Sequence, residues 1–217
     1  MKVFFGASGF AKEIYWLYKR QQQAKQQPFD DIEYFIVSDD EIISSHLLKD
    51  IKVIHESVFF NKFKKVDLIA YIAIGSPEIR KVIFNKVLNW NNNVNFPSLV
   101  DPSVIMDNDG AIKIGQGAII CAGNIITTDI IIDDFVHINI DCTIGHDVKI
   151  ASFSTLSPGC HISGNVNIGH SVFCGTGAVI LEEISIANNT IIGAGAVVTK
   201  DISVTGTYIG IPAKRVK

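Results

Sequence analysis

The second half of the chain repeats a large apolar residue at every sixth position. The repeat runs without a break from residue 114 to residue 198 and has fifteen members. They are Ile114, Ile120, Ile126, Ile132, Ile138, Ile144, Ile150, Leu156, Ile162, Ile168, Cys174, Ile180, Ile186, Ile192 and Val198. A six-residue period fits neither an α-helix, which repeats every ~3.6 residues, nor a strand with alternating faces. The pattern therefore indicates a repeat architecture whose units share one core.

Each hexad predicts a short strand followed by a corner. The large residue points inward, a small or polar residue follows, and a small or branched residue such as Ala118 or Val136 comes four positions later. Three hexads close a triangular coil, and stacked coils form parallel sheets about 4.8 Å apart. About five coils fit between residues 114 and 202. Antiparallel hairpins are the alternative, but the single Asp-Gly pair, Asp109-Gly110, precedes the repeat.

The first ninety residues have a different rhythm, in which short apolar runs alternate with helical stretches. This alternation predicts a small parallel sheet with helices on its faces. We expect strands at Lys2–Phe5, Tyr34–Val37, near Val53-Ile54 and at Asp67–Ile74. We expect helices from about Phe10 to Gln22 and from Pro77 onward, the second with the apolar stripe Ile79, Val82, Ile83, Val87 and Trp90. The expected domains are residues 1–95 and 96–217.

Glycine and acidic residues follow the expected strands of the first domain. Gly6-Ala7-Ser8-Gly9 comes after the first strand, Asp39-Asp40 after the second, and Gly75-Ser76 after the fourth. Parallel sheets bind ligands beyond the carboxyl ends of their strands, and a glycine loop that opens a helix offers N–H groups to a phosphate. The pattern therefore favours a nucleotide site. A tight turn that needs glycine only for its backbone is the alternative.

One of the six histidines has an adjacent carboxylate in the repeat. Gly145-His146-Asp147 sets Asp147 beside an imidazole, where it could accept the ring N–H and fix the tautomer. Gly164 follows 18 residues later and is expected one coil above His146. This setting favours a general base beside a backbone donor. A histidine on a solvated corner is the alternative. We expect His137, His161 and His170 to be polar corner residues and His46 and His55 to lie on the surface.

Composition narrows the function classes. The net charge of −3 gives no reason to expect a nucleic-acid partner, and no run of 18 apolar residues predicts a membrane span. The start of the chain reaches a glycine too early for a signal peptide, so a cytoplasmic protein is expected.

The four cysteines are expected to be small buried residues in the repeat, with Cys142 stacked on Cys160. No two of the four histidines in the repeat are expected to stack above one another in the coils. Because the ligands of a metal must converge on one ion, we expect no metal site.

The hexad pattern resembles that of the hexapeptide-repeat acyltransferases, whose hexads build a left-handed parallel β-helix. The tail Gly210-Ile211-Pro212-Ala213-Lys214-Arg215 is similar to the closing segment of that superfamily. Gly6–Gly9 and Tyr71–Arg80 are similar to segments of the bacterial nucleotide-sugar N-acetyltransferases, in the subgroup like the sialic-acid O-acetyltransferases. The resemblance implies an α/β domain before the β-helix, a homotrimer, and a role in surface glycan biosynthesis. It also implies acetyl transfer from acetyl-CoA to the C4 amine of a UDP-, dTDP- or GDP-linked amino-dideoxy sugar.

The resemblance also implies roles for particular residues. It assigns the base to His146, its partner to Asp147, the oxyanion donor to the amide of Gly164, and a sugar contact to Asn139. Thr155, Gly164, Thr176 and Ala194 would lie along coenzyme A. Gly6, Ser8, Gly9, Phe10, Asp39, Asp40, Gly75 and Ser76 would hold the nucleotide, for which we expect UDP or dTDP. Phe10 and Thr155 stand where many relatives have histidine, so those two roles transfer poorly.

Two other functions fit the same residues. An O-acetyltransferase acting on the hydroxyl of a sugar or a sialic acid would use the same fold and the same histidine. A protein that binds nucleotide sugars without catalysis would need neither His146 nor acetyl-CoA. The adjacent His146-Asp147 pair and the glycine one coil later favour an enzyme over the second alternative.

Overall fold

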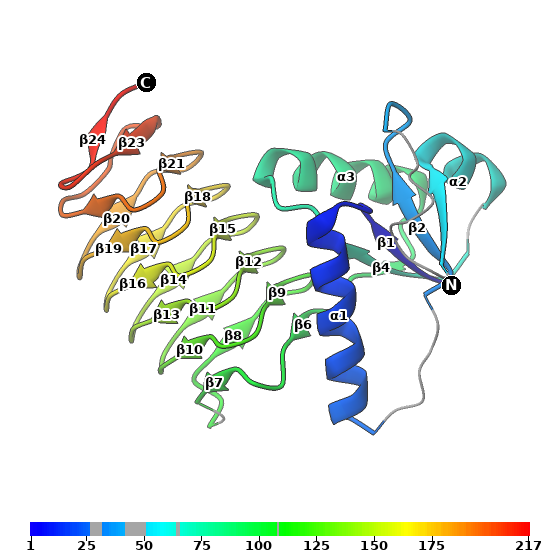
Figure 1. Ribbon diagram of the computed structural model, residues 1–217, viewed down its shortest axis with the longest axis horizontal. Coiled ribbons are helices and arrows are strands. Elements are labelled where there is room, and N and C mark those ends of the chain that lie inside the picture. Colours follow the sequence, from blue (N-terminus) through cyan, green and yellow to red (C-terminus); the bar gives the residue numbers. More distant parts are fainter. Residues whose placement is uncertain (27–31, 42–50, 64–65, 108) are drawn as a thin grey trace. The chain divides into compact units, whose positions relative to one another are not determined.

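The computed structural model describes residues 1–26, 32–41, 51–63, 66–107 and 109–217. The chain forms two compact units, Met1–Pro97 and Ser98–Lys217 (Figure 1). The first is a small α/β domain with a parallel sheet, and the second is a left-handed parallel β-helix. The fold class predicted from the sequence is therefore confirmed.

The first unit contains a five-stranded parallel sheet with the order β3-β2-β1-β4-β5. The strands are β1 (Lys2–Phe5), β2 (Tyr34–Val37), β3 (Lys52–His55), β4 (Leu68–Ile72) and β5 (Val94–Asn95). The helices are α1 (Gly9–Ala24), α2 (Glu56–Lys62) and α3 (Pro77–Trp90). The four expected strands and both expected helices are present, whereas α2 and β5 were not anticipated. The chain order reverses between β1 and β4, and in open parallel sheets ligands bind beyond the carboxyl ends of the strands at such a point.

Helix α3 buries a different stripe from the expected one. Ile83 and Val87 are buried as expected, but Ile79 and Val82 are 53% and 52% exposed. Arg80 is buried instead, and its Nη1 donates hydrogen bonds to the carbonyls of Ile74 (2.8 Å) and Gly75 (3.1 Å). Because these carbonyls follow β4, Arg80 turns its own side of the helix inward and ties down the loop between β4 and α3.

The second unit has three parallel sheets, which we name by a central strand of each. The β12 face consists of β24 (Lys214–Arg215), β23 (Thr207–Ile209), β21 (Ile191–Ile192), β18 (Phe173–Cys174), β15 (Thr155–Leu156), β12 (His137–Ile138), β9 (Ile119–Ile120) and β6 (Leu99–Val100). The β13 face consists of β22 (Val197–Val198), β19 (Val179–Ile180), β16 (His161–Ile162), β13 (Thr143–Ile144), β10 (Ile125–Ile126) and β7 (Ile105–Met106). The β14 face consists of β20 (Ser185–Ile186), β17 (Asn167–Ile168), β14 (Lys149–Ile150), β11 (Ile131–Ile132) and β8 (Lys113–Ile114).

The register of these sheets explains the six-residue period. Within the repeat, strand partners are 18 residues apart, as in Ile126 with Ile144 and Ile144 with Ile162. The second residue of each strand points inward, and the anchors from Ile120 to Val198 are buried in one continuous core. Leu99 and Ile105 begin a further coil before the repeat. The tail closes the unit as an antiparallel pair of β23 and β24.

Three stacks of corners join the faces. The His146 edge joins the β13 and β14 faces and contains residues 127–130, 145–148, 163–166 and 181–184. The Asn139 edge joins the β12 and β13 faces and contains residues 121–124, 139–142, 157–160, 175–178 and 193–196. The remaining edge joins the β14 and β12 faces. The third residue of most corners has a left-handed backbone, including Asp147 (φ 59°) and Asn165 (φ 58°). Aspartate and asparagine tolerate this conformation better than most residues.

The four cysteines are free and buried, as predicted. Cys142 Sγ lies 3.3 Å from the carbonyl oxygen of Ser157, and Cys160 Sγ lies 3.3 Å from that of Gly175. Burial raises the pKa of the Cys174 thiol to about 12. A protonated, enclosed thiol is a poor nucleophile, so Cys174 is a core residue.

Candidate active site

His146 and Asp147 form a direct contact on the His146 edge. Nδ1 of His146 lies 2.8 Å from Oδ2 of Asp147. The side chains are 59% and 55% exposed, so the pair lies on the surface of the chain. The left-handed backbone at Asp147 is part of the corner that follows β13. When Asp147 accepts a hydrogen bond from Nδ1–H, the neutral ring keeps its lone pair on Nε2. This is the arrangement required of a general base.

Gly164 lies against the imidazole, as the 18-residue spacing predicts. A Cβ placed on Gly164 would be 2.6 Å from both Cε1 and Nε2 of His146. The amide of Asn165 donates a 2.9 Å hydrogen bond to the carbonyl of His146, which holds the two coils together. Any larger residue at position 164 would therefore displace the ring.

Gly145 is a further small residue in this site that the sequence argument did not use. A Cβ on Gly145 would approach the amide nitrogen of Gly164 to 2.8 Å and the carbonyl carbon of Ser163 to 3.0 Å. Glycine at position 145 therefore keeps the Gly164 amide uncovered. The signal in the sequence is that Gly145 lies 18 residues before Ser163, so any side chain at 145 points toward the next corner.

The other residues expected near coenzyme A and the sugar lie elsewhere on the same chain. Asn139, Thr176 and Ala194 belong to the Asn139 edge, which is separated from the His146 edge by the β13 face. The Asn139 side-chain oxygen accepts a 2.8 Å hydrogen bond from the amide of Ile140. Thr155 lies in β15 on the β12 face and is 5% exposed. A single chain therefore brings together His146, Asp147 and Gly164 but not these four residues.

The prediction that the other repeat histidines lie at corners was wrong for two of them. His137 is in β12 and is 1% exposed, and His161 is in β16, where its Nδ1 lies 2.9 Å from Oγ1 of Thr143. Each precedes an inward anchor and so occupies the outward strand position of its hexad. His170 does lie at an exposed corner. In the first domain, His55 is half-buried, with Nδ1 3.1 Å from the Ser38 carbonyl oxygen, and His46 lies outside the described residues.

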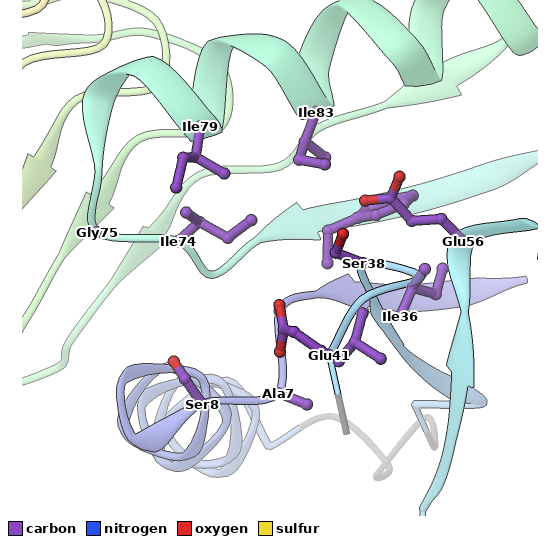
Figure 2. A pocket seen from close by; sticks show the side chains of 13 residues that line it. Ala7, Ser8, Ile36, Ser38, Glu41, Glu56, Ile74, Gly75, Ile79 and Ile83 are labelled. Atoms are coloured by element: carbon purple, nitrogen blue, oxygen red, sulfur yellow. The ribbon is translucent and has the colours of Figure 1, made fainter. Parts of the chain in front are cut away.

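The first domain has a cleft of about 160 Å³ at the carboxyl ends of β1, β2 and β4. Gly6, Ser8 and Gly75 line it, which agrees with their expected position. Gly6 has φ +102° and a Cβ there would meet the carbonyl oxygen of Ala73 at 2.8 Å, so this position requires glycine. Figure 2 shows Ser8 at the start of α1 on one side of the cleft and Ile79 of α3 on the other. Gly9 is the first residue of α1, so the helix begins directly after Ser8 of the cleft lining.

The two aspartates after β2 do not line this cleft. The amide of Ser57 donates a 3.1 Å hydrogen bond to Oδ1 of Asp39, which therefore caps α2. Asp40 accepts a hydrogen bond from the hydroxyl of Ser38. These bonds lower the pKa of each aspartate below its ordinary value. Phe10 and Ser76 are also outside the cleft lining, and Ser76 accepts a 3.4 Å hydrogen bond from the Ile79 amide as the cap of α3.

Two glutamates line the cleft in positions that the sequence argument missed. Glu41 belongs to the turn after β2, and Glu56 begins α2. Glu56 is 6% exposed and its Oε2 lies 2.7 Å from Nζ of Lys86 in α3. No local signal could reveal this ion pair, because its members are 30 residues apart and α2 was not expected.

Among the described residues, no helix has both the length and the apolar composition needed to cross a bilayer. The same residues contain no group of three or more histidine, cysteine, aspartate or glutamate side chains that could hold a metal ion.

Comparison with known families and structures covers both units. Residues 3–87 match the family model described as the PglD N-terminal domain. No curated protein gave a match to the chain. The acetyltransferase domain of PglB from Neisseria gonorrhoeae is 26% identical, with a TM-score of 0.84 over 99% of this chain and 98% of that one. The same domain has been solved in complex with acetyl coenzyme A, at a TM-score of 0.83.

Two further structures are similar over the full length. WeeI from Acinetobacter baumannii is 28% identical, with a TM-score of 0.84 over 100% of this chain and 99% of that one. A variant of perosamine N-acetyltransferase from Caulobacter crescentus, solved with CoA and GDP-perosamine, is 22% identical, with a TM-score of 0.82 over 100% and 96% of the two chains. At that identity, the perosamine enzyme shows only that the fold is shared. The family match therefore covers the first unit, and the chain is similar over its full length to the acetyltransferase domain of PglB.

Proposed function

We propose that this chain is an acetyl-CoA-dependent N-acetyltransferase that acylates the C4 amine of a nucleotide-linked amino-dideoxy sugar. The observation that carries the proposal is the contact of His146 with Asp147 on one side and with Gly164 on the other. A base with a fixed tautomer beside an uncovered backbone amide is what acyl transfer to an amine requires. The similarity to the PglB acetyltransferase domain over the whole chain supports the same class of reaction.

The reaction proceeds by direct attack of the amine on the thioester. The amine nitrogen forms a bond to the carbonyl carbon while Nε2 of His146 accepts a proton from that nitrogen. Asp147 stabilises the imidazolium through Nδ1, and the amide of Gly164 donates to the oxyanion. The tetrahedral intermediate then expels the thiolate of coenzyme A, which takes the proton from His146. The product is an amide and free coenzyme A, and no acetyl-cysteine is formed.

The nucleotide belongs to the cleft of the first domain in this proposal. The Gly6 amide donates a 2.7 Å hydrogen bond to the Ile36 carbonyl, so residues 7–9 at the start of α1 are the ones that offer backbone amides to the diphosphate. Ser8 adds a hydroxyl that makes no capping bond within α1, and Gly75 gives room at the end of β4. Asp39 accepts a hydrogen bond from the Ser57 amide and lines a hollow between α2 and α3, whereas Asp40 accepts a hydrogen bond from Ser38.

We also assign a homotrimer to the active enzyme. The β14 face turns Lys113, Lys149 and Asn167 outward, whereas the β13 face turns out Ile105 and Ile125, which are 66% and 43% exposed. Two exposed isoleucines at one end of this face favour packing against another copy.

The β13 face lies between the two edges that carry the predicted site residues. Packing copies along this face would place the His146 edge of one copy beside a neighbour. Thr176 and Ala194 of that neighbour could then complete the groove for coenzyme A, which a single chain does not assemble.

The test is a panel of UDP-, dTDP- and GDP-linked 4-amino sugars incubated with acetyl-CoA. Release of thiol together with a product that carries one added acetyl group and is stable to mild alkali would support N-acetylation. An alkali-labile product would show O-acetylation instead. Binding of a nucleotide sugar without thiol release from any member would contradict the catalytic proposal.

A further inference from the structure

Glu56 and Lys86 form an ion pair at the cleft, and together they offer a hydrogen-bond donor and an acceptor to a ligand. We propose that Glu56 and Lys86 recognise the base of the nucleotide and that this base is guanine. The inference rests on the proposed nucleotide role of the first domain. It departs from the sequence-based expectation of UDP or dTDP.

Glu56 is positioned between two neighbouring hollows of the first domain. It lines the cleft that contains the glycine loop and also lines a wider hollow of about 490 Å³ between α2 and α3. Figure 2 shows its carboxylate between Ser38 and Ile83 on the cleft side. A ligand whose diphosphate lies at the glycine loop would therefore reach Glu56 with its nucleoside end.

The wider hollow suits a flat aromatic ligand. Phe60 of α2 and Trp90 of α3 both line it, and their ring centroids are 5.4 Å apart at an interplanar angle of 56°. Both side chains are half-buried, so part of each ring remains accessible. Every nucleobase can stack on aromatic rings. Phe60 and Trp90 therefore contribute affinity for a base but no selectivity among bases.

The choice of base comes from the ion pair. Oε2 of Glu56 accepts a hydrogen bond from Nζ of Lys86 at 2.7 Å, and among the described residues its second oxygen accepts none. The Glu56 side chain is 8% exposed and that of Lys86 is 50% exposed, so the ammonium keeps donors for a ligand. A buried carboxylate with spare lone pairs requires N–H donors from whatever fills the site.

Guanine is the base whose hydrogen-bonding edge complements this pair completely. Its O6 can accept from Lys86, while N1–H and the N2 amino group can both donate to the carboxylate of Glu56. Uracil and thymine have the keto oxygen and one N–H, but their second keto oxygen would face the carboxylate and repel it. Cytosine and adenine offer one amino group each and no adjacent N–H. The order of affinity should therefore place guanine first.

An ion pair that only joins α2 to α3 would make no such distinction, so calorimetry on the full-length protein separates the two roles. GDP, IDP, UDP, dTDP, CDP and ADP are titrated separately. IDP is the matched ligand, because hypoxanthine has O6 and N1–H but lacks the amino group of guanine. We expect GDP to bind at least about tenfold more tightly than IDP and than each of the others, since a hydrogen bond to a charged group has about that effect.

Variants give the second arm of the test. Glu56→Gln should weaken GDP about ten- to a hundredfold and bring it close to UDP, and Lys86→Met should weaken GDP by removing the donor to O6. Lys81→Met, on an exposed position of the same helix, is the control and should bind GDP normally. If Glu56→Gln fails to fold, two measurements still test whether the pair recognises guanine. They are the affinity of Lys86→Met for GDP and the difference in affinity of the native protein between GDP and IDP.

Three outcomes are distinguishable. Preference for GDP that Glu56→Gln abolishes supports the assignment. Tighter binding of UDP or dTDP, or GDP binding unchanged in both variants, overturns it and leaves the proposed acetyl transfer intact. Binding of none of the six nucleotides contradicts the nucleotide role of the first domain itself.

Discussion

Gly164 lies so close to His146 that a single methyl group would occupy the space of the imidazole. A Cβ at Gly164 would be 2.6 Å from Nε2, the nitrogen that carries the lone pair when Asp147 accepts from Nδ1. The proposed base His146, its partner Asp147 and the proposed backbone donor Gly164 therefore lie together across two coils, and each proposed role can be tested by substitution.

Replacing His146 should remove catalysis and leave the fold intact. His146→Ala is expected to lower kcat by about 100- to 10,000-fold, the usual contribution of a general base. The side chain is 59% exposed, so the melting temperature should be nearly unchanged. His170→Ala, at an exposed corner of another edge, is the control. Near-normal turnover of His146→Ala in a thiol-release assay would refute the assignment.

A methyl group at Gly164 should act only through the ring that it displaces. Gly164→Ala is expected to lower kcat by about tenfold to a hundredfold, because a small misplacement of a catalytic group has effects of that size. In the His146→Ala background there is no ring to displace, so the same change should have almost no further effect. Equal effects in both backgrounds, measured as a double-mutant cycle, would show that Gly164 acts independently of His146.

Arg80 should contribute mainly to the stability of the first domain. Its guanidinium satisfies the carbonyls of Ile74 and Gly75, and burial lowers its pKa to about 9, so it remains protonated at pH 7. Arg80→Met is expected to reduce the free energy of unfolding by about 2–4 kcal/mol, because two part-buried carbonyls lose the charged donor that is buried beside them. Urea unfolding measures the loss. The exposed Lys81→Met should change it little, and equal stability of the two variants would contradict this role.

The sequence predicted the β-helix far better than it predicted the cleft. In the β-helix each residue stacks on the residue 18 places later in the chain. The position of Gly164 over His146 could therefore be predicted from the sequence alone. The cleft depends on contacts between distant segments. The pairing of Glu56 with Lys86 spans 30 residues. Ile79 was expected to be buried but is exposed, and Arg80 is buried in its place. The hydrogen bonds of Arg80 to two carbonyls outweigh the apolar pattern of the helix.

The acid stability of the first domain should depend on Asp39. Hydrogen bonding by the side chain and the backbone amide of Ser57 lowers the pKa of Asp39, so the contribution of Asp39 to stability is present above the ordinary aspartate value. That contribution is lost as the pH falls through the lowered pKa. The native protein should therefore melt at a higher temperature than Asp39→Asn near pH 7, and the two curves should converge as the pH falls below the ordinary aspartate pKa. A difference that is constant over this range would contradict a charge-dependent cap on α2.

The thiols should resist modification in the folded protein. All four cysteines are buried, and burial raises the pKa of Cys174 to about 12. Iodoacetamide at pH 8 should therefore label no cysteine until the chain is unfolded, as followed by mass spectrometry. Rapid labelling of one site, blocked by acetyl-CoA, would instead point to a covalent acetyl-enzyme.

The position taken by His146 recurs on every coil of its edge, where Thr128, Gly164 and Glu182 occupy the equivalent place. None of these side chains enters the central core, so the identity of each corner is largely free of the demands of folding. A catalytic residue can therefore be gained, lost or moved to another coil by a few surface substitutions, while the β-helix itself is kept. A descendant of this chain that has lost the histidine would be expected to survive as a binding protein of unchanged shape.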